Sequence, residues 1–396
     1  MRLLRRCGER FLDNPIKFFP YQDFTKAGFT LIINQVLKEV NMEYPFSVRQ
    51  FNISDPFILP VPETQKYYTY ARRFTRELFP EMKSGPYFYA LESPDLINWS
   101  RPIEVFKAPD NFWGPYDFWA PECHKWKDKY YIFSSFRGKG TYRRCQALVS
   151  DSPLGPFEPI CNEAATPDGW HCLDATMYVD KGGKPWMVFC HEWTQVQDGQ
   201  MAAIPLSDDL SRAIGGPIIL FHASEAPWRD DRLGYMPEKG MTWISGFITD
   251  GCFLHRMKNG TLIMLWSNFC RHGYAVGYAR SLSGEIEGPW EQEPIPLYVM
   301  DGGHAMLFHT FDGRLMMSMH APNHPLDKKR MLLFEMEEKG DHLYTVNEVT
   351  GNWFNIDKAK EPRAYYSRDL TVPPEFTKFG SGPIHSDFPN SEQIPL

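Results

Sequence analysis

Residues 173–191 read LDATMYVDKGGKPWMVFCH and contain the structural unit that decides the fold. A polar residue, Asp174, opens a short apolar run, and Lys181-Gly182-Gly183 is typical of a tight turn. A second apolar run, PWMVFCH, follows the turn. Short apolar runs bounded by Gly and Asp predict paired β-strands rather than helices.

The same unit recurs along the chain. Its second strand is recognisable as KYYTYAR, KYYIFSSFR, KPWMVFCHEW, TLIMLWSNF and RLMMSMH, and Asn259-Gly260 and Asp312-Gly313 are typical hairpin turns. Each unit opens on a polar lead residue: Asp55, Glu122, Asp174, Asp250 and His304. These residues recur at intervals somewhat longer than the ~40–50 residues of a four-stranded propeller blade. The sequence therefore predicts an all-β, five-bladed β-propeller, with a pair of β-sandwiches as the alternative.

The repeats also divide the chain. We predict a propeller over residues 42–357, a short N-terminal extension over 1–41 and an extended C-terminal tail over 358–396, which is rich in Pro, Ser and charge. Phe29 to Val40 has helical periodicity. Residues 1–41 are either a native helical extension or a translated leader, because codons for Lys38-Glu39-Val40 can spell a ribosome-binding sequence ahead of Met42.

Composition excludes several classes of function. The 396 residues carry a net charge of −7, whereas a non-specific nucleic-acid binder would be basic. No segment approaches the ~20 apolar residues of a membrane span, and the N-terminus lacks the apolar core of a signal peptide. The eight cysteines form no C-x-x-C pair and are expected to be reduced. We therefore predict a cytoplasmic protein without nucleic-acid or membrane partners.

The lead residues predict a common site. The first strand of each propeller blade lines the central channel, so polar residues at the start of five such strands should meet at one channel mouth. The set comprises three Asp, one Glu and one His. Neighbouring carboxylates raise one another's pKa, and such a cluster suits acid–base chemistry on a sugar acetal.

The motifs around these residues, in their order and spacing, resemble glycoside hydrolase family 43 over roughly residues 50–345. They are Ser54-Asp55-Pro56, Trp119-Ala120-Pro121-Glu122, Leu173-Asp174-Ala175, Thr249-Asp250-Gly251, Gly302-Gly303-His304 and Arg330. The resemblance implies a five-bladed propeller that cleaves arabinosides and xylosides with inversion, using an Asp base, an auxiliary Asp and a Glu acid. It thus implies an enzyme that removes terminal α-L-arabinofuranosyl or β-D-xylosyl units from small oligosaccharides.

The resemblance assigns catalytic roles residue by residue. Asp55 matches the general base, and Asp174 matches the Asp that orients the acid and tunes its pKa. The acid departs from the family pattern, because Asp250 stands where the family has Glu before Gly-Pro. Asp is one methylene shorter, so Asp250 needs a backbone shift or a closer substrate to deliver its proton. Glu192 is the alternative acid, although a substrate-binding or bracing role suits its place in His191-Glu192-Trp193 better.

Further residues are expected to contact the sugar. Glu122 lines the site or braces the loop of Trp119, and Arg330 contacts a sugar or carboxylate unless it is a surface residue. Four aromatic residues suit sugar stacking or the propeller core: Trp113, Phe118, Trp119 and Trp193.

The resemblance also bears on cofactors. His304 matches a channel His that often contacts a central metal, commonly calcium, or a water. No cofactor is required for the implied reaction, but a structural calcium at the channel centre is one expectation for His304. Hard cations prefer oxygen ligands, so an ordinary buried His is the other.

Two other functions remain open. One is phosphorolysis of a glycoside, which needs a basic phosphate pocket where the sequence has only scattered Arg. The other is a propeller that binds sugars without cleaving them, suggested by the shortened acid. In each case the expected partner is an oligosaccharide, and no feature of the sequence indicates an oligomeric state.

Overall fold

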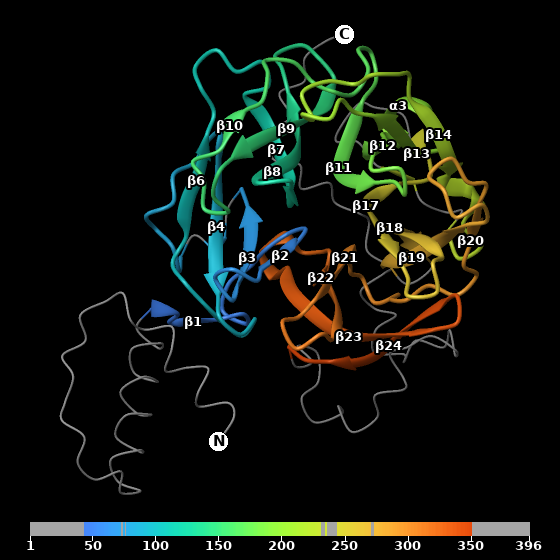
Figure 1. The fold of residues 1–396 in the computed structure, drawn as a ribbon. Helices are drawn as coiled ribbons and strands as arrows, with labels where there is room; N and C mark the ends of the chain where they lie inside the picture. The colour runs from blue at the N-terminus through green and yellow to red at the C-terminus, as the bar shows by residue number, and fades with distance from the viewer. Residues whose placement is uncertain are drawn as a thin grey trace, which may run out of the picture. The chain divides into compact units, whose positions relative to one another are not determined.

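The protein was analysed as a computed structural model that describes residues 43–350, except 73, 76, 231–233, 236–243 and 271–272. The predicted N-terminal extension (1–41) and C-terminal tail (358–396) lie outside the described residues. Within the described residues, five four-stranded antiparallel sheets are arranged in a ring around a common axis (Figure 1). The predicted five-bladed propeller is confirmed, and the alternative of paired sandwiches is wrong.

Each blade is one continuous segment whose strands pair in order from the channel outward. Blade 1 consists of β2 (Ile58–Val61), β3 (Lys66–Ala71), β4 (Tyr87–Ser93) and β6 (Ile103–Lys107). Blade 2 consists of β7 (Tyr116–Trp126), β8 (Lys129–Arg137), β9 (Arg143–Ser150) and β10 (Glu158–Pro159). Blade 3 consists of β11 (Cys172–Val179), β12 (Pro185–His191), β13 (Gln200–Pro205) and β14 (Ile218–His222).

The last two blades follow the same plan. Blade 4 consists of β17 (Asp250–Arg256), β18 (Leu262–Cys270), β19 (Gly273–Ser281) and β20 (Trp290–Gln292). Blade 5 consists of β21 (Gly303–His309), β22 (Leu315–Ala321), β23 (Arg330–Lys339) and β24 (His342–Glu348).

Short elements join or flank the blades. Two small sheets pair β1 (Phe46–Ser47) with β5 (Asn98–Trp99) and β15 (Gly234–Tyr235) with β16 (Ile244–Ser245). In the part of the chain that the structure describes, the helices are a single-turn α3 (Trp193–Val196) and the 3₁₀ turns η1 (Ala223–Glu225) and η2 (Leu326–Lys328). Among the described helices, none has the length and apolar character that a bilayer crossing requires.

The turn residues give the hairpins their geometry. Asn259-Gly260 joins β17 to β18, and Asp312-Gly313 joins β21 to β22, as the sequence predicts. Gly260 and Gly313 have φ angles of 92° and 87°, which glycine adopts without steric cost. The strands that follow these turns are almost entirely buried, which explains their continuous apolar sequence.

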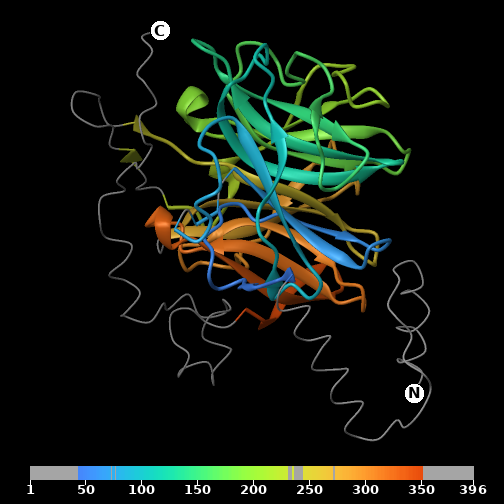
Figure 2. The ribbon, with the colours of Figure 1, turned by 90° about the vertical axis from the view of Figure 1, so that its left-hand side faces the viewer.

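The ring closes by packing of blade 5 against blade 1. The inner strands contact one another in ring order, and β21 contacts both β17 and β2. Tyr67 of blade 1 stacks on Phe311 with ring centroids 4.4 Å apart, and its hydroxyl accepts a hydrogen bond from the Phe311 amide at 3.1 Å. Figure 2 shows blade 1 facing the viewer between blade 2 and blade 5.

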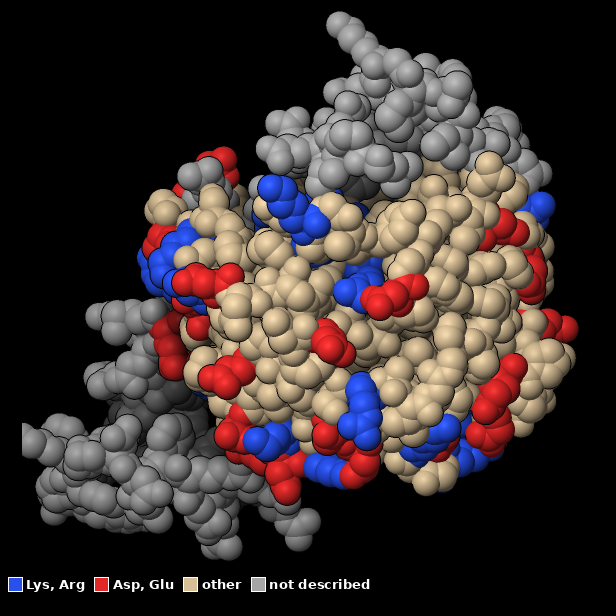
Figure 3. All heavy atoms as spheres, turned by 90° about the horizontal axis from the view of Figure 1, so that it is seen from above, with Lys and Arg blue, Asp and Glu red and all other residues tan. Residues whose placement is uncertain are grey.

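The surface and the thiols agree with the composition. On the face drawn in Figure 3, acidic and basic side chains are interspersed over the surface. The seven described cysteines form no disulfide with one another, and six of them are buried: Cys123, Cys145, Cys172, Cys190, Cys252 and Cys270.

Candidate active site

A β-bulge repeats in the inner strands at one mouth of the channel. The pairing of inner and second strands slips just after Trp119, Leu173, Asp250 and Gly303. Each slip contains a residue in the left-handed conformation, and Asp55, ahead of β2, has the same conformation. The five residues have φ between 45° and 56°: Asp55, Ala120, Asp174, Gly251 and His304. These five positions are therefore structurally equivalent.

This register corrects the sequence alignment of the lead residues. Asp55, Asp174 and His304 occupy equivalent positions, as predicted. Asp250 lies one residue before its bulge, and Glu122 lies two residues after its own, so the prediction of a shared position is wrong for both. The bulge inserts an extra residue that the alternation of apolar and polar side chains does not reveal.

Gly251 lies at the centre of the site, between Asp174 and His304. Its amide donates a hydrogen bond to Oδ2 of Asp174 at 3.1 Å. A Cβ at this position would lie 2.8 Å from both Cα and Cγ of His304, and the φ of 55° is left-handed. The close approach of β17 to β21 thus requires glycine.

We expect Gly251→Ala to destabilise the protein by about 1–3 kcal/mol through left-handed strain and the clash with His304, and to reduce any activity of the site. Gly216→Ala is the matched control, because Gly216 is exposed and a Cβ there meets open space. Thermal unfolding of the two variants measures the difference. Equal stability of both variants would contradict the role given to Gly251.

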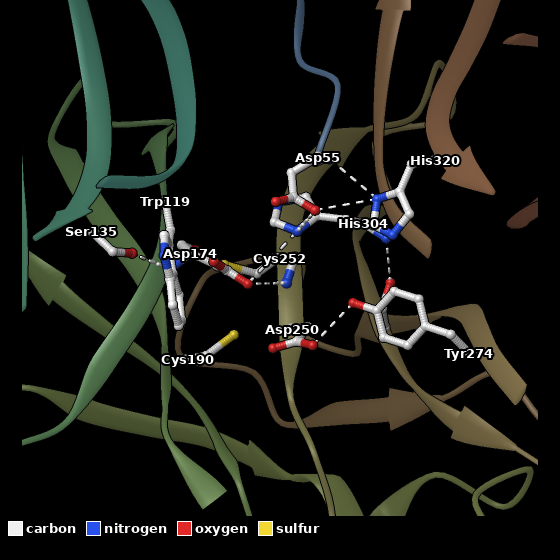
Figure 4. A network of polar contacts seen from close by, with 12 residues as sticks. Asp55, Trp119, Ser135, Asp174, Cys190, Asp250, Cys252, Tyr274, His304 and His320 are labelled. Atoms are coloured by element: carbon white, nitrogen blue, oxygen red, sulfur yellow. Dashed lines mark hydrogen bonds and ion pairs between the residues drawn. The ribbon is translucent and has the colours of Figure 1, made fainter. Parts of the chain in front are cut away.

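Asp55 lies between two histidine rings (Figure 4). Its Oδ1 is 3.2 Å from Nδ1 of His304 and 3.2 Å from Nδ1 of His320. Burial alone would raise the pKa of the Asp55 carboxyl, but favourable interactions, led by the positive charge of His304, outweigh it and hold the pKa well below its ordinary value. Asp55 is therefore a carboxylate that can accept a proton.

Of these two rings, His304 carries the positive charge. The Asp55 amide donates to Nδ1 of His320 at 3.2 Å, so that nitrogen is unprotonated, and Nε2 donates to Oδ1 of Asn323 at 3.1 Å. Burial lowers the pKa of His320 to about 4, which fits a neutral ring. Burial also acts to lower the pKa of His304, but the charges of Asp55 and Asp174 outweigh it and raise that pKa.

Asp174 contacts the same imidazole nitrogen as Asp55. Its Oδ2 lies 3.7 Å from Nδ1 of His304, and its amide donates to Oγ of Ser135 at 3.0 Å. Burial raises the pKa of Asp174 most, and the nearby Asp55 charge adds to this. The imidazole of His304 and the Gly251 amide nevertheless give this carboxylate two favourable contacts.

Asp250 shares this cluster but has a different environment. Its Oδ2 accepts a hydrogen bond from the Tyr274 hydroxyl at 3.1 Å. Burial, followed by the charges of Asp174 and Glu192, holds the pKa of Asp250 well above its ordinary value. Because Asp174 has the better contacts for a negative charge, we place the proton of this coupled pair on Asp250. The cluster thus combines a proton acceptor, Asp55, with a proton donor, Asp250, as acid–base catalysis requires.

Glu122 lies deeper in the channel, roughly 6–7 Å along the strand from Ala120. Its Oε2 is 3.3 Å from Nε2 of His124, and that nitrogen also accepts a weak hydrogen bond from the Met177 amide at 3.5 Å. Burial raises the pKa of Glu122 to about 8, so at neutral pH it holds a proton that it can share with His124. This placement favours the bracing role over contact with a sugar.

Arg143 contacts two of the residues that were predicted to bind sugar, and the sequence did not predict this role for it. Its guanidinium stacks over the Trp119 ring at 3.6 Å and contacts Oε2 of Glu192 at 3.3 Å. Trp119 lies at the edge of the acidic cluster in Figure 4. Burial raises the pKa of Glu192, and the contact with Arg143 acts against this rise. The contact itself suits a brace or a hydrogen-bond acceptor.

The other aromatic candidates are packed into the protein. Phe118 is buried in an aromatic cluster, with ring centroids 5.3 Å from Phe88 and 5.0 Å from Phe136. Trp113 packs against this cluster and hydrogen-bonds Gln146 through Nε1. Trp193 is buried against Gly246, where a Cβ would lie 2.4 Å from its ring. The structure does not bring Phe118 or Trp113 to the carboxylates, so the alternative of core packing suits both.

Arg330 is also turned away from the acidic cluster. Its Nη1 donates to the backbone oxygens of Asp327 at 3.2 Å and Lys329 at 2.8 Å. The preceding residue, Lys329, is buried and interacts electrostatically with Asp55 and Asp250. In the sequence these residues form the basic run Lys328-Lys329-Arg330, and only the fold shows which of them lies near the acidic cluster.

The channel can be compared with the needs of a calcium ion. The described residues contain no group of three or more His, Cys, Asp or Glu side chains placed to hold a metal. Nε2 of His304 is buried without a hydrogen-bond partner among them. One nitrogen does not make the oxygen cage that calcium prefers, so these residues do not fit a dedicated calcium site, and metal analysis of the purified protein would test the expectation.

Comparisons with known proteins bear on the chemistry. A family model described as glycosyl hydrolases family 43 matches residues 45–350. The solved structure of the endo-arabinase from Bacteroides thetaiotaomicron VPI-5482 is 40% identical, with a TM-score of 0.68, and the match covers 75% of this chain and 98% of that one.

Two curated proteins match over shorter segments. Extracellular endo-alpha-(1->5)-L-arabinanase 1 of Bacillus subtilis (strain 168) is 23% identical over 117 residues, which are 27% of this chain and 36% of that protein. Xylosidase/arabinosidase 43A of Humicola insolens is 33% identical over 89 residues, 22% of this chain and 26% of that protein. These alignments span about a third and a quarter of the two relatives.

The family model spans all five blades and the acidic cluster, as the sequence motifs predict. The chain belongs to glycosyl hydrolases family 43.

Proposed function

We propose that this protein hydrolyses α-L-arabinofuranosidic bonds in small oligosaccharides with inversion, with Asp55 as general base, Asp250 as general acid and Asp174 as the residue that orients and tunes the acid. The supporting observation is the contrast between two carboxyls of one cluster: Asp55 lies 3.2 Å from two histidine rings, which favours its ionised form, whereas burial and neighbouring carboxylates raise the pKa of Asp250. An inverting glycosidase needs such a pair, because one carboxylate activates water while the other carboxyl protonates the leaving oxygen.

Geometry supports a sequence of proton movements. Asp55 would take a proton from a water on the face of the sugar opposite the leaving group. Asp250 would give its proton to the glycosidic oxygen, with the Tyr274 hydroxyl fixing its orientation. The negative charge of Asp174 favours the protonated form of Asp250 until the transition state, where the departing alkoxide takes that proton.

The relatives favour arabinose as the sugar. The 40% identical structure is titled an endo-arabinase, and a curated relative is named an arabinanase. Because another relative is named a xylosidase/arabinosidase, β-D-xylosides are a second candidate substrate. Removal of terminal units, as predicted from the sequence, remains our expectation for the cleavage mode, although the first of these relatives is named for endo action.

A substrate panel tests the proposal. We expect hydrolysis of aryl α-L-arabinofuranosides and α-1,5-linked arabino-oligosaccharides, with slower hydrolysis of aryl β-D-xylosides. Release of arabinose from one end, followed over time, distinguishes terminal cleavage from internal cleavage. Turnover that depends on phosphate would favour a phosphorylase, and tight sugar binding without turnover would favour a binding propeller.

The pH dependence tests the role of Asp174. Because Asp55 must be ionised and Asp250 protonated, kcat/KM should fall on the acid side with the pKa of Asp55 and on the alkaline side with that of Asp250. Asp174→Asn removes a charge that raises the pKa of Asp250, so the alkaline limb should move to lower pH by about one unit. An unchanged alkaline limb in this variant would contradict the tuning role.

A further inference from the structure

Lys329 occupies a position that the sequence does not single out. It follows η2 and directly precedes β23, and it is only 8% exposed. The adjoining residues of β23 are paired with β22, with Arg330 opposite Ala321 and Met331 opposite His320. The loop therefore places Lys329 beside the strand that carries His320, at the mouth of the channel.

The charge of Lys329 acts on the acidic cluster. It interacts electrostatically with four carboxylates and with both histidines of the cluster: Asp55, Asp174, Asp250, Asp301, His304 and His320. Yet no described carboxylate lies within 4 Å of its Nζ, and no described residue hydrogen-bonds that atom. Lys329 therefore offers a cation that has no close partner among the described residues and can donate hydrogen bonds to a ligand.

The surroundings specify what that ligand must be. An ammonium offers three donors, whereas the neighbouring ionised carboxylates accept hydrogen bonds. A polyhydroxylated sugar matches this mixture, because each hydroxyl both donates and accepts. The ionised carboxylates around this single cation outnumber it and would repel an anion such as phosphate at the same place.

We propose that Lys329 binds the substrate in this pocket, donating hydrogen bonds to a sugar hydroxyl that lies beside Asp55. This deepens and rests on the proposed hydrolysis of arabinosides. Bound in this way, the hydroxyl supplies the partner that Lys329 lacks, and the ammonium balances the negative charge of the base. Arg330, whose guanidinium bonds backbone oxygens instead, does not take part.

The adjacent cations allow a matched experiment. Lys329→Met removes the charge but keeps the length of the side chain, and Arg330→Met removes a charge one residue away. We expect Lys329→Met to raise KM for an aryl α-L-arabinofuranoside by about 10- to 100-fold, the range for a hydrogen bond to a charged group, with a smaller change in kcat. Lys329→Arg should recover part of the loss, and Arg330→Met should stay within about twofold of wild type.

A second readout is independent of turnover. The charge of Lys329 lowers the pKa of His304 and His320, so NMR titration of the imidazoles should give higher pKa values for both rings in Lys329→Met and unchanged values in Arg330→Met. If wild type cleaves no substrate of the panel, the proposed function fails, whereas this titration and calorimetric binding of arabinotriose still test Lys329. Unchanged imidazole titrations, unchanged sugar affinity, or equal losses in both Met variants would overturn the proposal.

Discussion

Asp55→Asn is expected to lower kcat/KM for aryl α-L-arabinofuranosides by about 10²–10⁴-fold, the usual contribution of a general base. The side-chain amide of Asn cannot accept the proton of the attacking water. Asn nevertheless tolerates the left-handed φ of 53°, and the backbone N–H of residue 55 can still donate to His320. The loss should therefore be chemical rather than structural. Initial rates over a range of pH, combined with thermal unfolding, measure both.

The control for this variant is Asp110→Asn. Asp110 is exposed and outside the channel, so this change removes one carboxylate without touching the cluster. It should leave both activity and unfolding temperature unchanged. Full activity of Asp55→Asn, or a loss matched by Asp110→Asn, would refute the assignment of Asp55 as base.

Asp250→Asn is expected to have the second large effect, and the effect should depend on the leaving group. Hydrolysis of arabino-oligosaccharides should fall by about 10²–10⁴-fold, because their alkoxide leaving groups need a proton. Aryl glycosides with an acidic phenol should lose much less, since that phenolate departs unaided. Steady-state kinetics on both kinds of substrate measure the difference.

Glu192→Gln is the matched control for the acid. Glu192 is buried near Asp250 and is tied to Arg143 by a contact of 3.3 Å. Its amide variant should weaken sugar binding or disturb the Trp119 loop, with similar losses on both kinds of substrate. If Glu192→Gln shows the leaving-group dependence and Asp250→Asn does not, the proton donor is Glu192.

Much of the fold follows from local sequence rules. The strand and turn signals are strong because each blade repeats them, and Asn259-Gly260 and Asp312-Gly313 occur at the turns that they predict. The meeting of Asp55, Asp174 and His304 then follows from ring geometry alone. A repeated pattern thus carries information about residues that are far apart in the chain.

The remaining parts of the site depend on details that a pattern of residue types does not contain. The bulges shift Asp250 and Glu122 away from the common position, and they involve an ordinary Ala120 as readily as Gly251. Arg143 enters the site because β9 packs beside β11. The sequence does not distinguish the environments of the adjacent cations Lys329 and Arg330, which depend on the path of the loop before β23.

The measurement that tests this account most directly is the configuration of the first product, read by ¹H NMR before the sugar mutarotates. The account places Asp55 and Asp250 on opposite sides of the scissile bond, with water attacking directly. It therefore predicts that an aryl α-L-arabinofuranoside first yields β-L-arabinofuranose. Initial appearance of the α-anomer would contradict it, because retention requires a covalent intermediate on an enzyme carboxylate.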